Sequence, residues 1–304
     1  MIPNFDFFHE DTESYLSVGE ITIAVGFRCN LQCYGCSTVS NYKMHDPFTL
    51  ADRLSWIESL GDMLARNNLT IGRMSIGGGE PFITKDTIPL INKIYEVFPK
   101  SMMRHSIVSN GLLVRKNLDI LDAIQEHNMA FSISMHRTDE EAETEYKKLF
   151  ELMAARNIKF GTTFTSNTRP WMLQYKTENG KVIPAESDIN KSWTVCKSKH
   201  WSHISDYKLL KCPKITYLDR MLTHTNQLDD PQWQKYRKYK GIDCRTANLD
   251  DVIKFFTAGP EDICGMCSET NVFYNEKPVF QKDYENFNFE DKKVFSFSLN
   301  PKNK

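Results

Sequence analysis

The feature that most constrains this chain is a set of three cysteines, Cys29, Cys33 and Cys36, which directly follows a β-rich run at 21–27. We expect a strand over that run, so that the three thiols share one loop at its carboxyl end, where barrel enzymes build their active sites. A structural zinc ion or a closed cluster needs four protein ligands, whereas three thiolates leave one iron of a 4Fe-4S cluster open. This first cysteine set therefore favours an open, reactive cluster. The alternatives are a zinc site completed by a distant histidine and a chance group of buried thiols.

The first half of the chain alternates β-rich runs with amphipathic helical patterns, which is typical of a parallel sheet built from βα units. We expect strands at 21–27, 73–76, 106–108, 131–135 and 159–164. Helices should begin near Thr49 and Pro89 and should cover 118–124 and 140–155. A complete eight-stranded barrel takes about 250 residues. Five or six units within residues 1–185 therefore predict an α/β fold with a partial, open (β/α)5-6 barrel of the TIM type.

Glycines and polar side chains follow the second, third and fourth of these strands. The second strand ends in a glycine run and an acid, Gly77, Gly78, Gly79 and Glu80, and alone such a run is a tight turn. The next two strands end in side chains that suit sugar hydroxyls and carboxylates, namely Ser109, Asn110, Ser134 and His136. Because parallel strands end at one edge, these groups are candidates for a shared binding site.

The first cysteine set, followed one βα unit later by the glycine run and Glu80, resembles the signature of the radical S-adenosylmethionine (radical SAM) enzymes. The resemblance implies a 4Fe-4S cluster on the three cysteines, with S-adenosylmethionine as second cofactor. It also implies that the glycine backbone approaches the methionine end, that Glu80 accepts from its ammonium group, and that Ser109, Asn110, Ser134 and His136 line the cofactor. In the family an aromatic residue precedes the third cysteine, whereas here Gly35 stands there and Tyr34 is the aromatic candidate.

A second cysteine set, with a CxxC at its end, consists of Cys196, Cys212, Cys264 and Cys267. Four thiolates suit a closed cluster and a zinc ion equally well, and His200 and His203 are alternative ligands. The arrangement resembles the C-terminal twitch module of some radical SAM enzymes, a short SPASM-like form, which implies one auxiliary 4Fe-4S cluster at 186–270. The leftover Cys244 is a buried small hydrophobe, a substitute ligand or a participant in substrate chemistry.

The resemblance implies an enzyme that an external donor such as flavodoxin or ferredoxin reduces, and that cleaves S-adenosylmethionine to a 5'-deoxyadenosyl radical. It is greatest to 2-deoxy-scyllo-inosamine dehydrogenase-type enzymes, which implies a two-electron oxidation of a small molecule such as a sugar or cyclitol alcohol. No catalytic residue is assigned, and Arg169 and Cys244 are the candidates. The alternatives are a peptide-modifying maturase, an epimerase and a non-catalytic iron-sulfur or zinc protein, which has no need of the glycine run.

Charge and composition exclude some classes of binding partner for this chain. The chain carries 38 basic and 39 acidic residues, so neither nucleic acid nor a membrane surface is expected as a partner. It shows neither a signal-peptide pattern nor a span of about 20 apolar residues, which predicts a cytoplasmic protein. The segment 271–304 combines charges with many aromatics, and we expect it to pack along the surface rather than form a loose tail.

Overall fold

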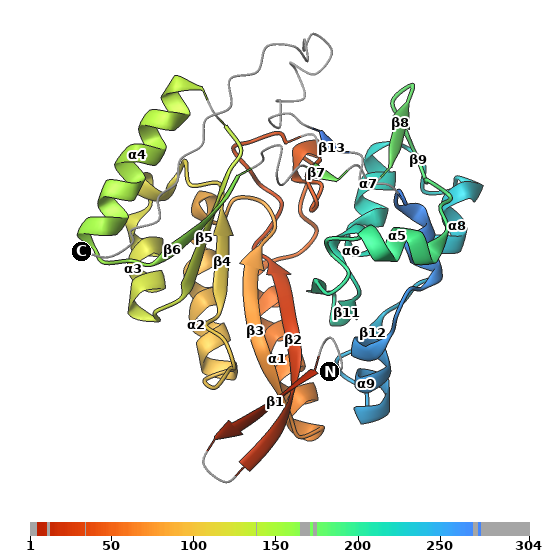
Figure 1. Ribbon diagram of the computed structural model, residues 1–304, viewed down its shortest axis with the longest axis horizontal. Helices are drawn as coiled ribbons and strands as arrows, with labels where there is room; N and C mark the ends of the chain where they lie inside the picture. The colour runs from red at the N-terminus through yellow and green to blue at the C-terminus, as the bar shows by residue number, and fades with distance from the viewer. Residues whose placement is uncertain are drawn as a thin grey trace.

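The computed structural model describes residues 5–10, 13–33, 35–137, 139–164, 171–172, 175–269 and 273–274. Its main sheet contains a parallel series formed by β2 (Glu13–Ala24), β3 (Leu69–Gly77), β4 (Ser106–Ser109), β5 (Ala130–Met135) and β6 (Phe160–Phe164). These are the five predicted strands, although β2 begins eight residues before the expected 21. The α/β class and the partial open barrel are confirmed (Figure 1).

The sheet continues past β2 into the second half of the chain. β10 (Ser202–Ser205) pairs in parallel with β2, and β11 (Lys208–Leu210) and β12 (Ile242–Asp243) extend the sheet in antiparallel pairs. The amino-terminal half of β2 also pairs with β1 (Phe5–Glu10), in an antiparallel ribbon that projects from the sheet (Figure 1). One sheet therefore runs across the boundary expected at residue 185, and the division into 1–185, 186–270 and 271–304 stays a prediction.

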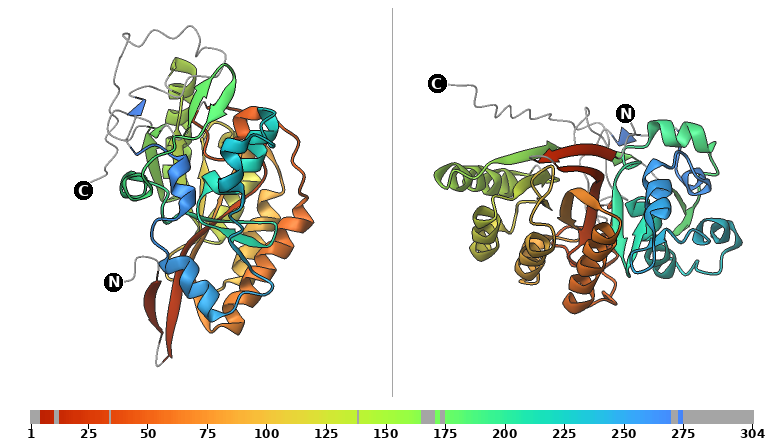
Figure 2. Two further views of the ribbon diagram at one scale, coloured as in Figure 1. Left: turned by 90° about the vertical axis from the view of Figure 1, so that its right-hand side faces the viewer. Right: turned by 90° about the horizontal axis from the view of Figure 1, so that it is seen from below.

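Helices α1 (Leu50–Arg66), α2 (Thr87–Val97), α3 (Leu118–Glu126) and α4 (Glu140–Ala155) cover one face of the parallel strands (Figure 2). The first begins at a capping box, in which the Thr49 hydroxyl accepts from the backbone N–H of Asp52 and the Asp52 carboxylate accepts from the backbone N–H of Thr49. Its inner face buries Trp56, Ile57 and Leu60 against the strands. The apolar stripe of the helix is thus matched to the sheet, as its periodicity predicts.

Shorter elements build the C-terminal part around a second apolar core that includes Trp233 and Leu222. Its helices are α5 (Ile189–Val195), α6 (Pro213–Thr216), α7 (Leu218–His224), α8 (Pro231–Arg237) and α9 (Leu249–Thr257). A hairpin is formed by β8 (Lys176–Glu178) and β9 (Lys181–Ile183). Four 3-10 turns complete the path: η1 (Ser40–Tyr42), η2 (Pro81–Ile83), η3 (Val114–Lys116) and η4 (Asp262–Met266).

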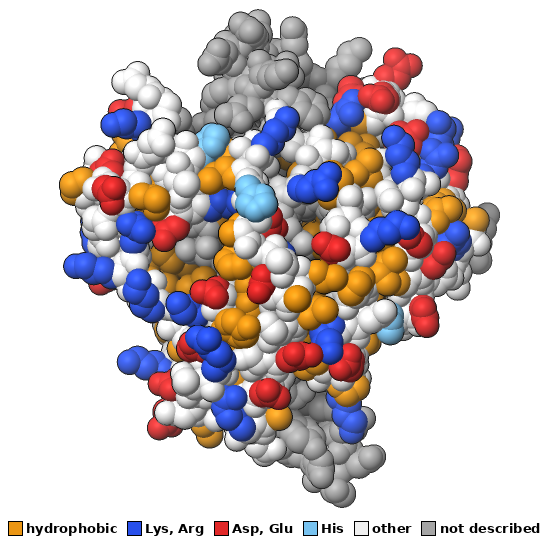
Figure 3. Space-filling model, turned by 180° about the vertical axis from the view of Figure 1, so that it is seen from behind, with side chains coloured by type: hydrophobic (Ala, Val, Ile, Leu, Met, Phe, Trp, Pro, Cys, Tyr) orange, Lys and Arg blue, Asp and Glu red, His pale blue; other side chains and the backbone are white. Residues whose placement is uncertain are grey.

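The segment 271–304 lies outside the described residues except for β13 (Phe273–Tyr274), which pairs with β7 (Trp171–Met172). Within the part that the structure describes, no helix is long and apolar enough to span a bilayer. On the face seen from behind, basic and acidic side chains are interspersed (Figure 3). That surface therefore presents no single-sign charge field.

Leu60 tests the role of the α1 face. Its side chain is fully buried between helix and sheet, so we expect Leu60→Ala to lower the free energy of unfolding by about 2–5 kcal/mol, measured by urea denaturation. Leu118, which is 37% exposed at the start of α3, is the control, and Leu118→Ala should cost about 0.5 kcal/mol or less. Equal losses in the two variants would contradict this assignment of the core.

Candidate functional site

The carboxyl ends of β2 to β5 lie side by side and form one rim of the sheet. In the pairing ladder, Ala24 on β2 lies opposite Gly77 on β3, and Ser109 on β4 lies opposite Ile133 on β5. The pairs between β3 and β4 keep this alignment. The first cysteine set, the glycine run and the polar candidates after β4 and β5 therefore leave the sheet at the same edge.

The glycine run packs backbone to backbone against the start of the cysteine loop. Gly78 has φ +105°, and a Cβ on it would lie 2.6 Å from the carbonyl oxygen of Gly26. A Cβ on Gly79 would lie 2.1 Å from the carbonyl oxygen of Arg28. Two of the three glycines are thus required by contact with the chain itself, whereas Gly77 has ordinary space around its Cα.

Glu80 lies buried at the centre of this turn, with 1% of its surface exposed. Its carboxylate accepts from the backbone N–H of Phe82 at 3.0 Å, the hydroxyl of Ser109 at 2.7 Å and the backbone N–H of Asn110 at 2.8 Å. A carboxylate offers about four acceptor positions, so one remains, on Oε2. Burial outweighs these bonds and raises the pKa of Glu80.

The thiols of the first cysteine set lie close enough that the charge on one raises the pKa of another. The backbone N–H of Leu31 donates to Cys29 Sγ at 3.4 Å, and Cys36 Sγ lies 3.4 Å from the hydroxyl of Thr38. That hydroxyl donates to the carbonyl oxygen of Gly78 at 2.7 Å, which joins the loop to the glycine run. Burial raises the pKa of Cys29 to about 12 and raises that of Cys33 as well, so metal binding by this loop must release protons.

Asn110 connects the cysteine loop to β4. Its amide nitrogen donates to the side-chain oxygen of Asn30 at 2.8 Å and lies 3.9 Å from Cys29 Sγ. Its amide oxygen accepts from the backbone N–H of Leu112. The hydroxyl of Ser109 is also used internally, since it donates to Glu80 and accepts from the backbone N–H of Gly111. The side chains of Ser109 and Asn110 therefore stabilise the rim through hydrogen bonds to its own groups.

Two of the remaining cofactor candidates lie at the end of β5, and one lies outside the described residues. Ser134 and His136 lie half-buried at the end of β5, and burial lowers the pKa of His136 to about 4, so its ring is neutral near pH 7. Tyr34 lies outside the described residues. The candidate base Arg169 does too.

The second cysteine set comes together from three separate elements. Cys196 follows α5, Cys212 precedes α6, and the CxxC pair belongs to η4 and its end. Their thiols raise one another's pKa values in addition to the larger effect of burial. The two cysteine sets are therefore separate groups, each collected by the fold.

Among the described residues, no group of three or more His, Cys, Asp or Glu side chains is arranged to hold a metal ion. The donor chemistry of each set nevertheless suits an iron-sulfur cluster, because each gathers thiols with backbone N–H donors nearby.

The histidines near Cys196 make other contacts, and the leftover cysteine lies in the main core. His200 packs edge-on against Trp193, and the Nδ1 of His203 lies 3.0 Å from the hydroxyl of Tyr217. Cys244 is fully buried in the main core, and burial raises its pKa to about 12. Its place in the core matches the small-hydrophobe alternative.

Lys214 is a group that sequence reasoning missed. It follows Cys212 by two residues and is 6% exposed. Its ammonium group is near thiols of both cysteine sets, and burial lowers its pKa to about 8. A lysine in a cysteine-bearing segment gives no signal in the sequence, because most lysines face solvent.

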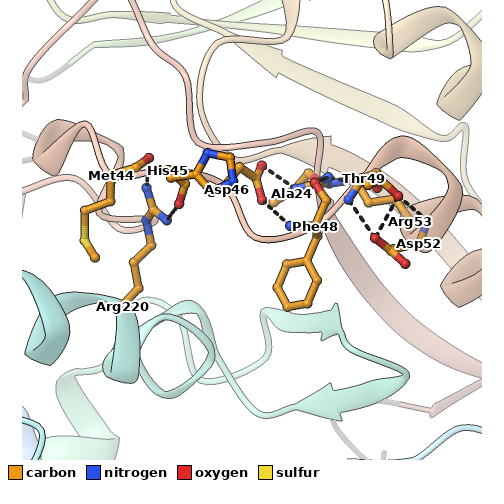
Figure 4. Close-up of polar contacts among 9 residues, drawn as sticks. All are labelled: Ala24, Met44, His45, Asp46, Phe48, Thr49, Asp52, Arg53 and Arg220. Atoms are coloured by element: carbon orange, nitrogen blue, oxygen red, sulfur yellow. Dashed lines mark hydrogen bonds and ion pairs between the residues drawn. The ribbon is translucent and has the colours of Figure 1, made fainter.

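Two arginines hold the segment that returns from the cysteine loop, and sequence reasoning missed these as well (Figure 4). The guanidinium of Arg53 on α1 donates to the carbonyl oxygens of Ala24 and Phe48, each at 2.8 Å, and pairs with Asp46. Arg220 on α7 donates to the carbonyl oxygens of residues 44 and 45. The loop is thus fixed from the barrel side and from the C-terminal side at once.

A groove of about 530 Å³ lies beside this returning segment. Its lining includes Phe27, Phe48, Tyr217 and Arg220. Among the described residues, neither cysteine set nor any predicted cofactor residue lines this groove, so it is distinct from the described part of the rim.

No protein-family model matches the chain, and no curated protein matches it in sequence. Solved structures are similar in fold. A structure of BtrN in complex with AdoMet and 2-DOIA is 16% identical over 85% of this chain and 96% of that chain, with a TM-score of 0.47. Native anSMEcpe with bound AdoMet is 18% identical over 47% of this chain and 43% of that one, with a TM-score of 0.37. Streptococcus suis SuiB bound to S-adenosylmethionine is 13% identical over 82% and 78%, with a TM-score of 0.31.

The buried Glu80 predicts a pH effect on the protein without cofactors. Because its pKa is higher folded than unfolded, its contribution to stability is full below the unfolded pKa and is lost as pH rises through the folded value. We expect Glu80→Gln to gain in stability relative to the wild type as the pH rises above about 4, the usual pKa of an unfolded glutamate. Urea unfolding at several pH values measures this difference, and a difference that stays constant with pH would contradict it.

Proposed function

We propose that this chain is a radical SAM enzyme that carries out a two-electron oxidation of a small molecule such as a sugar or cyclitol alcohol. The observation that carries the proposal is the gathering of two unlike thiol sets in one fold. Three thiols lie at the strand-end rim beside the buried Glu80, and four lie among the C-terminal helices. An open cluster and a closed cluster require these two donor counts.

The residues of the rim fit an open 4Fe-4S cluster and S-adenosylmethionine. The first cysteine set would hold the cluster, and the free acceptor position of Glu80 would take the ammonium of the methionine end. A Cβ on Gly77 would meet the Thr22 methyl at 3.6 Å, an ordinary contact, so Gly77 is less crowded by the chain than Gly78 and Gly79. Ser134, His136 and Tyr34 would line the rest of the cofactor. When bound, the two cofactors supply the 5'-deoxyadenosyl radical that removes a substrate hydrogen.

The second cysteine set would hold an auxiliary 4Fe-4S cluster within a twitch-like module at 186–270. The role of the fold is to fix this set relative to the rim, through the pairing of β10 with β2. An external donor such as flavodoxin or ferredoxin would supply the electron for the rim, in the reducing cytoplasm where free thiols persist.

Iron content tests both sites. After anaerobic reconstitution we expect about eight irons per chain, falling to about four in the Cys29/Cys33/Cys36 triple alanine variant. Incubation with dithionite and S-adenosylmethionine should yield 5'-deoxyadenosine with the wild type and none with that variant. Stoichiometric zinc without cofactor cleavage would overturn the proposal.

Removal of the second set should separate the two sites. We expect the Cys264/Cys267 double alanine variant to keep about four irons and to form 5'-deoxyadenosine, because the rim is intact. Cys244→Ala is the matched control, since this thiol is buried in the core and should leave the iron count unchanged. Loss of iron in that control would show that Cys244 is a ligand.

The substrate class is tested by product analysis. The reconstituted enzyme is incubated with aminocyclitols and sugars in one series and with peptides in another. The products are examined by mass spectrometry. Loss of two hydrogens from an alcohol supports the proposal. Modification of peptides alone would favour the maturase alternative.

A further inference from the structure

Lys214 is a buried ammonium group for which the described protein provides no hydrogen-bond partner. The residue is 6% exposed on α6, and no acceptor lies within bonding distance of its Nζ in the part of the chain that the structure describes. A buried charge is stable only when an opposite charge or good acceptors accompany it. The position therefore calls for a negative partner.

Lys211, a neighbouring lysine, is a buried ammonium group whose hydrogen-bond partners are all provided by this fold. The Nζ of Lys211 donates to the carbonyl oxygens of Ala258 and Gly259 and pairs with the carboxylate of Glu261. Its exposure is nearly that of Lys214, at 5%. Burial alone thus does not explain why Lys214 lacks partners.

The charges that face Lys214 come from thiols. Its ammonium interacts with Cys267, Cys212 and Cys196 of the second cysteine set and with Cys36 of the first. The other titratable group facing it is His203, a buried ring on β10, whose Nε2 has no partner among the described residues. Three of the four thiols that face Lys214 belong to the second cysteine set. Negative charge on that set would therefore be the main partner of the Lys214 ammonium group.

We infer that Lys214 is the counter-cation of the auxiliary cluster and raises its reduction potential. This inference rests on the proposed function. Four thiolates give a closed cluster a net negative charge, which grows by one when the cluster is reduced, and a nearby cation favours the more negative form. The substrate radical, an alcohol carbon that has lost its hydrogen, gives one electron to this cluster and one proton to solvent, and it becomes a carbonyl. Lys214 is a positioning residue for that electron transfer.

Redox titration of the auxiliary cluster alone tests the inference. In the Cys29/Cys33/Cys36 triple alanine background, we expect Lys214→Met to lower the equilibrium constant for reduction about tenfold, a shift of 59 mV for one electron, followed by electron paramagnetic resonance. Lys214→Arg keeps the charge and should remain near the parent potential. Lys235→Met removes an exposed charge that pairs with Glu186 on the same module and is the control.

The outcomes separate the two proposals. If the triple alanine background binds no iron, the auxiliary cluster and the role of Lys214 are overturned together. If iron is present and Lys214→Met leaves the potential unchanged, only the role of Lys214 is overturned.

The protein without cofactors gives a second readout that does not depend on the cluster. An ammonium buried without a partner destabilises the fold, so Lys214→Met should unfold at a higher temperature than the parent. A lower unfolding temperature would show that Lys214 already has a structural partner and would overturn the inference.

Discussion

Two backbone hydrogen bonds hold the glycine run against the cysteine loop, and the arrangement of the rim depends on them. The N–H of Gly79 donates to the carbonyl oxygen of Gly26 at 2.7 Å, and the N–H of Glu80 donates to that of Arg28 at 2.8 Å. Because no side chain fits between these backbones, the loop that carries the three thiols is fixed by the end of the neighbouring strand. The buried carboxylate of Glu80 then extends the same support to β4.

Much of the fold is predictable from the sequence because it is local. The stripe of α1, the capping box at Thr49 and the strands that precede the cysteines and glycines follow from periodicity and short-range hydrogen bonding. The gathering of the rim follows from a general property of parallel sheets, whose strands end at one edge. The cofactor and metal roles of those residues remain predictions.

What could not be predicted depends on contacts between distant parts of the chain. Arg220 reaches the carbonyl oxygens of residues 44 and 45 across about 175 positions in sequence. The burial of Lys214 likewise depends on the cysteines that the fold brings to it. The family resemblance implies that the glycine run is approached by a ligand, whereas for Gly78 and Gly79 the close neighbour is the backbone of the chain itself. Sequence patterns report which faces are apolar, but not which distant segment covers a polar group.

The parallel pairing of β10 with β2 has a mechanical consequence. The strand that leads into the first cysteine set is the neighbour of β10 in one hydrogen-bonded ladder, and β10 lies between Cys196 and Cys212 along the chain. The C-terminal part is therefore held to the parallel strands by backbone hydrogen bonds and is not a lobe that swings on a linker.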